Sequence, residues 1–197
     1  MRNAFTRAVL LAAGLAAGAC AGPSIHGRLD DGVEVRMFGH ASLEAGQGEF
    51  QVACQGQPGE TLVLYFLRKG YYPQIRLLEI PTGRMQQTAG PWRELPDALR
   101  GVLAGVVCTC AAGGRRARVF FVEGFESSRS LTIELDGRPT PITTDARGVF
   151  VELLPPGRYR AKVDWAPRLF GDGAGTIEIE AAATTILDIC KLTTLVD

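Results

Sequence analysis

Three features are scarce or missing in this chain of 197 residues, and each excludes a class of protein. Asparagine occurs once, at Asn3, so the rest of the chain has no N-glycosylation sequon. Histidine occurs twice, at His26 and His40, and no Gly-x-Ser-x-Gly motif is present, so histidine-assisted nucleophilic catalysis has no support. No apolar run approaches the roughly 20 residues that cross a bilayer as a helix, so a permanent transmembrane helix is excluded.

The N-terminus has the order of a secretory signal peptide. Arg2 and Arg7 supply positive charge, residues 8–17 are apolar, and small residues precede Cys20. We therefore predict a signal peptide over residues 1–19. Its removal leaves 19 basic and 21 acidic side chains, a net charge of −2, and this balance does not favour nucleic acid as a partner.

Cleavage after Ala19 is compatible with two routes. Residues 17–19 (Ala-Gly-Ala) satisfy the small-x-small rule of ordinary signal peptidase, which would give a soluble periplasmic or secreted protein with Cys20 free or paired between chains. The same site resembles a bacterial lipoprotein, and this implies a lipid on Cys20, which becomes the new N-terminus. Ala21, in place of aspartate, resembles lipoproteins sent to the outer membrane. Residues 20–32, short and polar, are then predicted to form a lipidated tether.

The five cysteines favour the lipid anchor. If Cys20 carries lipid, Cys54, Cys108, Cys110 and Cys190 remain, and four thiols can form two disulfides in an oxidising compartment. Cys108 and Cys110 are two residues apart on a predicted strand, so they point the same way and are poorly placed to bond each other. Two connectivities stay open, in which one of them joins Cys190 and the other joins Cys54. The spacing does not suit a zinc site, so no metal or other cofactor is expected.

From residue 33 onward the apolar positions alternate with period two, interrupted by Gly and Pro, and this predicts an all-β fold of one or two small immunoglobulin- or transthyretin-like β-sandwiches. The clearest strands cover residues 33–37, 50–54, 131–135 and 159–165. Residues 61–67 are apolar throughout, which predicts a strand covered on both faces.

The C-terminal half has the most specific pattern. Asp145 and Gly148 suit a turn, residues 155–157 (Pro-Pro-Gly) separate two strands, and Phe150 and Tyr159 are expected to be core anchors on neighbouring strands. This pattern, T-D-x-x-G-x-F followed by L-P-P-G-x-Y, resembles the carboxypeptidase regulatory-like domain, a small transthyretin-like β-sandwich. The resemblance covers residues 102–192 and implies a domain over 99–197. Such domains recur as accessory or binding modules of exported proteins.

The N-terminal half repeats this scheme weakly. Gly48-Glu-Phe50 parallels Gly148-Val-Phe150 at an offset of 100 residues, so we predict a second sandwich-like domain over residues 33–90. Residues 81–98, rich in Pro, Gly and polar groups, are predicted to form the hinge between the two domains.

Three aromatic residues stand in predicted loops. Tyr71 and Tyr72 lie between Gly70 and Pro73, and Trp92 lies in the predicted hinge. Exposed aromatics there could stack on sugar rings or contact a protein partner, whereas the structural alternative is ordinary packing at the edge of a small core.

These features together predict a non-enzymatic cell-envelope lipoprotein that acts as a structural or protein-interaction module. Its predicted partners are the membrane, through the N-terminal lipid, and an envelope protein. The alternative is a carbohydrate- or peptidoglycan-binding module that uses Tyr71, Tyr72 and Trp92. A minor alternative is an enzyme of unrecognised type.

Overall fold

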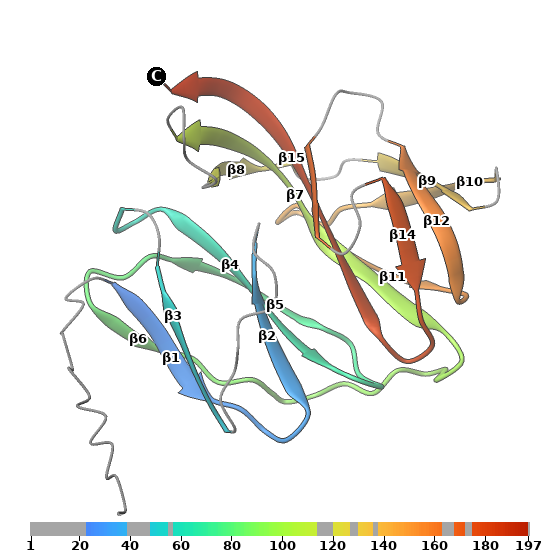
Figure 1. Ribbon diagram of the computed structural model, residues 1–197, viewed down its shortest axis with the longest axis horizontal. Helices are drawn as coiled ribbons and strands as arrows, with labels where there is room; N and C mark the ends of the chain where they lie inside the picture. Colours follow the sequence, from blue (N-terminus) through green and yellow to red (C-terminus); the bar gives the residue numbers. More distant parts are fainter. Residues whose placement is uncertain are drawn as a thin grey trace, which may run out of the picture.

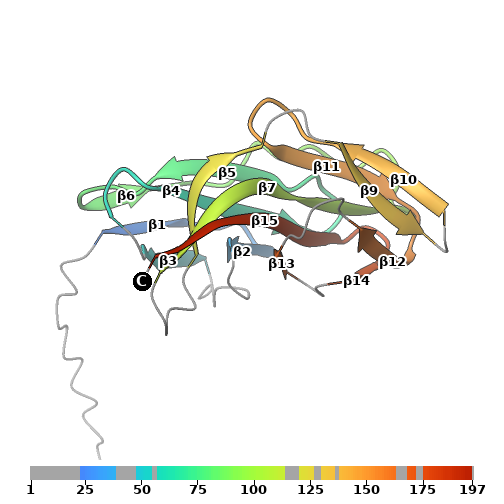
Figure 2. The same ribbon diagram turned by 90° about the horizontal axis from the view of Figure 1, so that it is seen from above.

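The computed structural model describes residues 23–38, 48–54, 57–113, 120–126, 130–135, 138–162, 168–171 and 175–196. Every regular element in these ranges is a β-strand, so the all-β prediction is confirmed. In the same ranges there is no helix with the length and apolarity that a membrane span requires. The strands form two stacked β-sandwiches, with β1, β3 and β6 at one end of the molecule and β9, β10, β12 and β14 at the other (Figures 1 and 2).

The N-terminal sandwich has an outer sheet in the order β3-β1-β6 and an inner sheet in which β4 pairs with both β2 and β5. Its core lies between these sheets and includes Ile25, Phe50, Leu64 and Phe66, each at most 4% exposed. The strands are β1 (Ser24–Arg28), β2 (Val33–Met37), β3 (Glu49–Ala53), β4 (Thr61–Arg68), β5 (Gln74–Glu79) and β6 (Arg84–Gln86).

The C-terminal sandwich has an outer sheet in the order β10-β9-β12-β14 and an inner sheet in which β7 pairs with β11, β15 and β8. Phe150 and Tyr159 are core anchors here, as expected, but they face each other from the two sheets and do not lie on neighbouring strands. The strands are β7 (Gly101–Gly113), β8 (Phe120–Phe125), β9 (Ser130–Leu135), β10 (Arg138–Thr143), β11 (Val149–Leu154), β12 (Gly157–Lys162), β13 (Arg168–Gly171), β14 (Thr176–Ile179) and β15 (Thr184–Val196).

A third core lies between the two inner sheets and joins the sandwiches. On β4, Leu62, Leu64 and Phe66 face the N-terminal core, whereas Val63, Tyr65 and Leu67 face this inter-sandwich core, so the prediction of a strand covered on both faces is confirmed. Strand β7 alternates in the same way between the inter-sandwich core and the C-terminal core. The inner sheets are also continuous through β8, which pairs with β7 and meets β4 at Thr61 and Val122.

Two sequence predictions at the edges of the N-terminal sandwich are wrong. Residues 24–28 of the predicted tether form β1, because the fully buried Ile25 contributes to the core and the main chain pairs with β3. Residues 84–86 of the predicted hinge form β6, which pairs in parallel with β1. Neither segment is a free linker in the structure.

The turn predicted at Asp145 and Gly148 is confirmed. The Asp145 carboxylate accepts hydrogen bonds from the main-chain nitrogens of Arg147 (2.8 Å) and Val149 (3.0 Å), and Gly148 takes a positive φ of 73°. Partial burial acts to raise the pKa of Asp145, but the hydrogen bonds from Val149 and Arg147 outweigh it and lower the pKa overall. The folded turn therefore favours the ionised form of the Asp145 carboxylate.

Candidate binding surface

The loop between β4 and β5 carries Tyr71 and Tyr72. It begins with a turn in which the main-chain nitrogen of Tyr71 donates to the carbonyl of Arg68 (3.1 Å), and Gly70 takes a φ of 83° that a residue with a side chain rarely adopts. The nitrogen of Gly70 donates to the carbonyl of Ala182 (2.7 Å) in the C-terminal sandwich. The loop is thus tied to both halves of the molecule.

The chain that leads from β6 to β7 runs alongside this loop. The nitrogen of Tyr72 donates to the carbonyl of Arg93 (2.9 Å), and the nitrogen of Leu95 donates to the carbonyl of Gly70 (2.9 Å). The Gln74 side chain adds two more contacts, since its amide nitrogen donates to the carbonyl of Pro91 (2.9 Å) and its oxygen accepts from the nitrogen of Gly90 (2.9 Å). These bonds hold the predicted hinge segment in place beside the two tyrosines.

Tyr71, Tyr72 and Trp92 therefore lie in neighbouring segments, each only partly buried, and Trp92 packs against the N-terminal core. The rings of Tyr71 and Trp92 meet edge to face, with centroids 6.0 Å apart and an interplanar angle of 65°. The Arg68 guanidinium lies over both rings, 4.7 Å from the centroid of Tyr71 and 5.9 Å from that of Trp92. The Arg93 guanidinium lies 4.8 Å from the Tyr72 centroid. The contacts form two groups, Arg68 with Tyr71 and Trp92, and Arg93 with Tyr72. We call these five residues together the aromatic-arginine surface.

The surface continues onto the C-terminal sandwich. A hollow of about 510 Å³ beside Tyr72 is lined in part by Arg93 and by Val151, whose side chain on β11 is 37% exposed. A second hollow, of about 450 Å³, is lined by residues of both sandwiches. Arg68 lines this second hollow as well, and Glu178 and Glu180 of the C-terminal sandwich line it from the other side. The aromatic-arginine surface is therefore flanked by two hollows to which both sandwiches contribute.

The sequence pattern indicates the three aromatic residues but not the two arginines that lie against them. Arg68 precedes Tyr71 by three residues, and Arg93 follows Trp92 directly. An arginine next to an aromatic pair in a loop is a weak signal for cation–π packing, because many surface arginines point into solvent. The register that places Arg93 on Tyr72 depends on hydrogen bonds between segments about 20 residues apart, as in Tyr72 to Arg93.

The cysteines form one disulfide within the described residues, between Cys110 on β7 and Cys190 on β15, with Cα atoms 6.0 Å apart. This is one of the two bonds in one of the predicted connectivities. The expected second disulfide, from Cys108 to Cys54, does not form, and both thiols are free. The reason is their location, since Cys108 is fully buried in the inter-sandwich core, whereas Cys54 packs against the N-terminal core. The sheet that contains β4 lies between these two cores.

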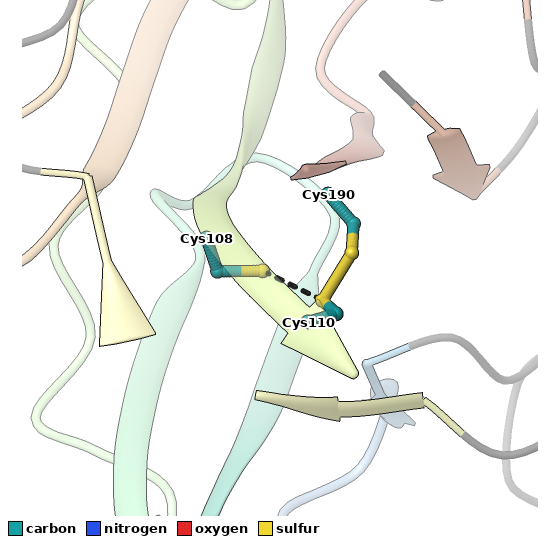
Figure 3. A group of neighbouring side chains, drawn as sticks. All are labelled: Cys108, Cys110 and Cys190. Carbon is teal, nitrogen blue, oxygen red and sulfur yellow. Dashed lines mark hydrogen bonds between the residues drawn. A yellow bond between two sulfur atoms is a disulfide. The ribbon is translucent and has the colours of Figure 1, made fainter. Parts of the chain in front are cut away.

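Three sulfur atoms gather in the inter-sandwich core, those of Cys108, Cys110 and Cys190 (Figure 3). The Sγ atoms of Cys108 and Cys110 are 3.4 Å apart without a bond between them, as their positions on one strand predict. Burial, and then the nearby Asp188 carboxylate, raise the pKa of the Cys108 thiol far above its ordinary value. The thiol is therefore protonated and unreactive at neutral pH.

Several residues from the sequence predictions lie outside the described residues, including Cys20, His40 and Ala21. His26 is described, and it lies on β1 with a partly exposed side chain beside a hollow of about 400 Å³. It is not part of the aromatic-arginine surface.

Comparison with known proteins yields no family. No family model matches the chain, and no curated protein matches it. Among solved structures, the chain is similar to the TIE protein of Bacillus anthracis, with 14% identity and a TM-score of 0.28 over 87% of this chain and 34% of that protein. The chain thus spans about a third of the length of that protein.

Two pilin structures are similar at the same low level. The minor pilin GBS52 of Streptococcus agalactiae matches with 11% identity and a TM-score of 0.29, over 89% of this chain and 99% of the pilin. The major pilin T-13 of Streptococcus pyogenes matches with 10% identity and a TM-score of 0.17, over 87% of this chain and 97% of the pilin. Values this low transfer neither a site nor a function to this chain.

Proposed function

We propose that this protein is a non-enzymatic lipoprotein of the bacterial cell envelope, and that its two β-sandwiches act as a structural or protein-interaction module. The observation that carries this proposal is the aromatic-arginine surface. Tyrosine, tryptophan and arginine are the residues most enriched at the energetic centres of protein interfaces. Here they occur in two neighbouring groups, at the end of β4 and in the loops beside it, and each group borders a hollow to which both sandwiches contribute.

The rigidity of this surface supports the same role. Loops that order on binding lose conformational entropy, and this loss weakens the complex. The Tyr71–Tyr72 loop is already held by main-chain hydrogen bonds to Arg93, Leu95 and Ala182. The two sandwiches are packed together through the inter-sandwich core, so a partner that contacts both would meet a single preformed surface.

A carbohydrate ligand is the second candidate. The hollow beside Tyr72 supports it, because its lining combines an aromatic ring with the polar side chains of Gln74 and Arg93. A sugar stacks on a free ring face, however, and Arg68 already covers one face of Tyr71. The arrangement therefore favours a protein partner over a glycan.

The proposed anchor would hold the folded part close to the bilayer. If lipid is attached to Cys20, three residues lie between it and Ser24, the first residue of β1, so the two Cα atoms are four Cα-to-Cα steps apart. Four extended steps span at most about 14 Å. The outer sheet of the N-terminal sandwich would then lie next to the membrane surface, and the proposed interaction would take place in the envelope near that membrane.

The anchor predicts a definite mass and location for the mature protein. We expect the protein purified from bacterial membranes to begin at Cys20 and to carry the added mass of the acyl chains. We expect the Cys20→Ala variant to appear in the soluble envelope fraction with no lipid mass. Intact-mass spectrometry of the protein from the membrane fraction and from the soluble fraction measures the mass of each form. An unmodified N-terminal cysteine would refute the anchor and leave the fold unaffected.

The interaction role predicts that removal of the three rings abolishes partner capture. A photo-crosslinking residue placed at Lys69, which is exposed and next to Arg68, should capture a discrete envelope protein in intact cells. In the combined Tyr71→Ala, Tyr72→Ala and Trp92→Ala variant we expect this product to fall at least tenfold. A tenfold loss of affinity corresponds to about 1.4 kcal/mol. Hot-spot side chains contribute about 2 kcal/mol or more each, so the removal of three of them should weaken binding by well over tenfold.

The matched control for this experiment is Arg28→Ala, because Arg28 is 85% exposed on the β1 sheet and lines a different hollow. It should leave the crosslinked product unchanged. If the triple variant and the control give the same product as the unaltered protein, the surface is not the interface. If the triple variant loses retention on isolated peptidoglycan or envelope polysaccharide instead, the carbohydrate role replaces the protein-interaction role.

A further inference from the structure

We propose that Cys190 forms its disulfide with either Cys110 or Cys108, so that the oxidised protein is a mixture of two disulfide isomers in the inter-sandwich core. The structure shows the first isomer, in which Cys108 is the free thiol. In the second, Cys108 is bonded to Cys190 and Cys110 is free. This inference concerns a core modification and is independent of the proposed binding function.

The register of β7 and β15 is the first observation. These strands are parallel, and the residue that stands directly opposite Cys190 is Cys108, not Cys110. Neighbouring strands lie about 4.8 Å apart, and the Cα atoms of bonded cysteines are usually about 4.4 to 6.8 Å apart. The opposite position therefore satisfies the distance requirement, as does the diagonal position of Cys110, whose Cα is 6.0 Å from that of Cys190.

The positions of the sulfur atoms are the second observation. The Cys108 side chain points along β7 toward the disulfide, with its Sγ 3.4 Å from that of Cys110 (Figure 3). The Sγ atoms of all three cysteines lie within 4.8 Å of one another, and all three residues are 0% exposed. Cys108 and Cys110 belong to the same face of one strand, so both present their sulfur atoms to Cys190.

Exchange between the isomers keeps the number of disulfide bonds and of free thiols unchanged, so it needs no added oxidant. The Cys108 thiol loses its proton, and the resulting thiolate attacks the Sγ of Cys190. The bond between Cys108 and Cys190 forms as the bond between Cys190 and Cys110 breaks, and the Cys110 thiolate that leaves takes up a proton. Because burial and Asp188 keep Cys108 protonated, this step is slow in the folded protein. The ratio of isomers is therefore set while the chain folds and oxidises.

A metal ion is the other ligand that three neighbouring sulfur atoms suggest. It would require reduction of the disulfide and then three thiolates in a dry core. The Asp188 carboxylate, 2% exposed, already places negative charge close to Cys108. A bound cation would offset part of this charge, but it could bind only after the disulfide that the structure shows had been reduced. The geometry accordingly favours a second disulfide partner over a metal site.

The test counts free thiols in the full chain with Cys20→Ala, which removes the anchor cysteine from the count. The protein is refolded with oxidised and reduced glutathione, quenched in acid, denatured and titrated with a thiol reagent. The parent should show two free thiols, from Cys54 and from whichever of Cys108 and Cys110 is unpaired. In Cys110→Ala we expect one free thiol, because Cys108 takes over the bond to Cys190. Three free thiols in folded Cys110→Ala would overturn the proposal.

Two further variants serve as controls for the number of free thiols in Cys110→Ala. Cys108→Ala retains the disulfide seen in the structure and should also show one free thiol, whereas Cys190→Ala should show three. If Cys110→Ala does not fold, as judged by near-UV circular dichroism, Cys110→Ser replaces it in the count.

The parent protein itself gives the second readout. Cyanylation of free thiols followed by alkaline cleavage cuts the chain before each free cysteine, so it distinguishes free Cys108 from free Cys110. We expect fragments that begin at residue 108 and fragments that begin at residue 110. Fragments that begin at 108 alone would show one isomer and overturn the proposal of a mixture.

Discussion

Gly105→Ala is expected to lower the free energy of unfolding by about 3 kcal/mol or more, the upper end of what overpacking of a core costs. Gly105 lies on β7, with β11 on one side and β15 on the other. A Cβ atom at this position would lie 1.9 Å from the main-chain oxygen of Leu187 and 3.0 Å from the ring of Phe150. The oxygen belongs to the backbone of β15 and cannot turn away as a side chain could.

Glycine is therefore what allows β7 and β15 to approach each other beneath the Phe150 ring. The matched control is Gly83→Ala, because a Cβ there meets no atom within 4 Å and Gly83 has no positive φ. The control should stay within about 0.5 kcal/mol of the parent. Urea denaturation followed by tryptophan fluorescence measures both variants. Equal midpoints for Gly105→Ala and Gly83→Ala would show that the β7–β15 contact is looser than the structure indicates.

Tyr65→Phe is expected to lower the free energy of unfolding by about 2 to 4 kcal/mol, although it removes a single oxygen atom. Tyr65 on β4 is fully buried, and its hydroxyl donates a hydrogen bond to the carboxylate of Asp188 on β15. The same carboxylate oxygen accepts from the nitrogen of Val106 (3.2 Å). Tyr65 thus makes a polar contact between the two sandwiches. Without its hydroxyl, the buried carboxylate of Asp188 loses a hydrogen-bond donor that water cannot replace.

Tyr159→Phe is the control, because Tyr159 is also buried but donates to a neutral carbonyl, that of Pro155 (2.6 Å), within the C-terminal sandwich. A hydrogen bond of this kind contributes about 0.5 to 1.5 kcal/mol. Urea unfolding at pH 7 should therefore show the larger loss for Tyr65→Phe. Equal losses would mean that the Asp188 carboxylate draws little stability from Tyr65.

The Tyr65 contact also predicts how stability changes in alkali. Burial, followed by the charge of Asp188, raises the pKa of Tyr65 well above its ordinary value. Since the folded state holds this proton more tightly than the unfolded chain, stability is intact below about pH 10, the pKa of an unfolded tyrosine, and declines as the pH rises beyond it. Tyr65→Phe should show a shallower decline between about pH 10 and 11 than the parent, measured by the same urea titration.

Much of the local structure could be predicted from particular residues. The apolar run at 61–67 predicted a strand covered on both faces, because alternate side chains of a strand point in opposite directions. Asp145 and Gly148 predicted their turn, because an aspartate side chain bonds nearby main-chain nitrogens and glycine tolerates a positive φ. The spacing of Cys108 and Cys110 predicted that they would not bond each other.

The errors of prediction arose where distant segments meet. Residues 24–28 are polar enough to suggest a tether, yet Ile25 alone contributes a fully buried side chain once β3 pairs alongside. The even number of cysteines predicted a bond to Cys54, yet its thiol is free. The number of cysteines contains no information about which side of the β4 sheet each of them lies on. Pairing between segments far apart in sequence is set by the whole fold and is not encoded in a local period.

The sequence by itself determined the all-β class, the strand that two cores cover and the turn at Asp145, since each depends on residues close together along the chain. Only the tertiary structure decided that the two sandwiches share a third core, that Tyr65 meets Asp188 across it, and that Arg68 and Arg93 cover the predicted aromatic residues. The physical reason is that the alternation of side chains along a strand determines which face of the sheet a residue lies on. Which residue it contacts on that face depends on how all the sheets pack together.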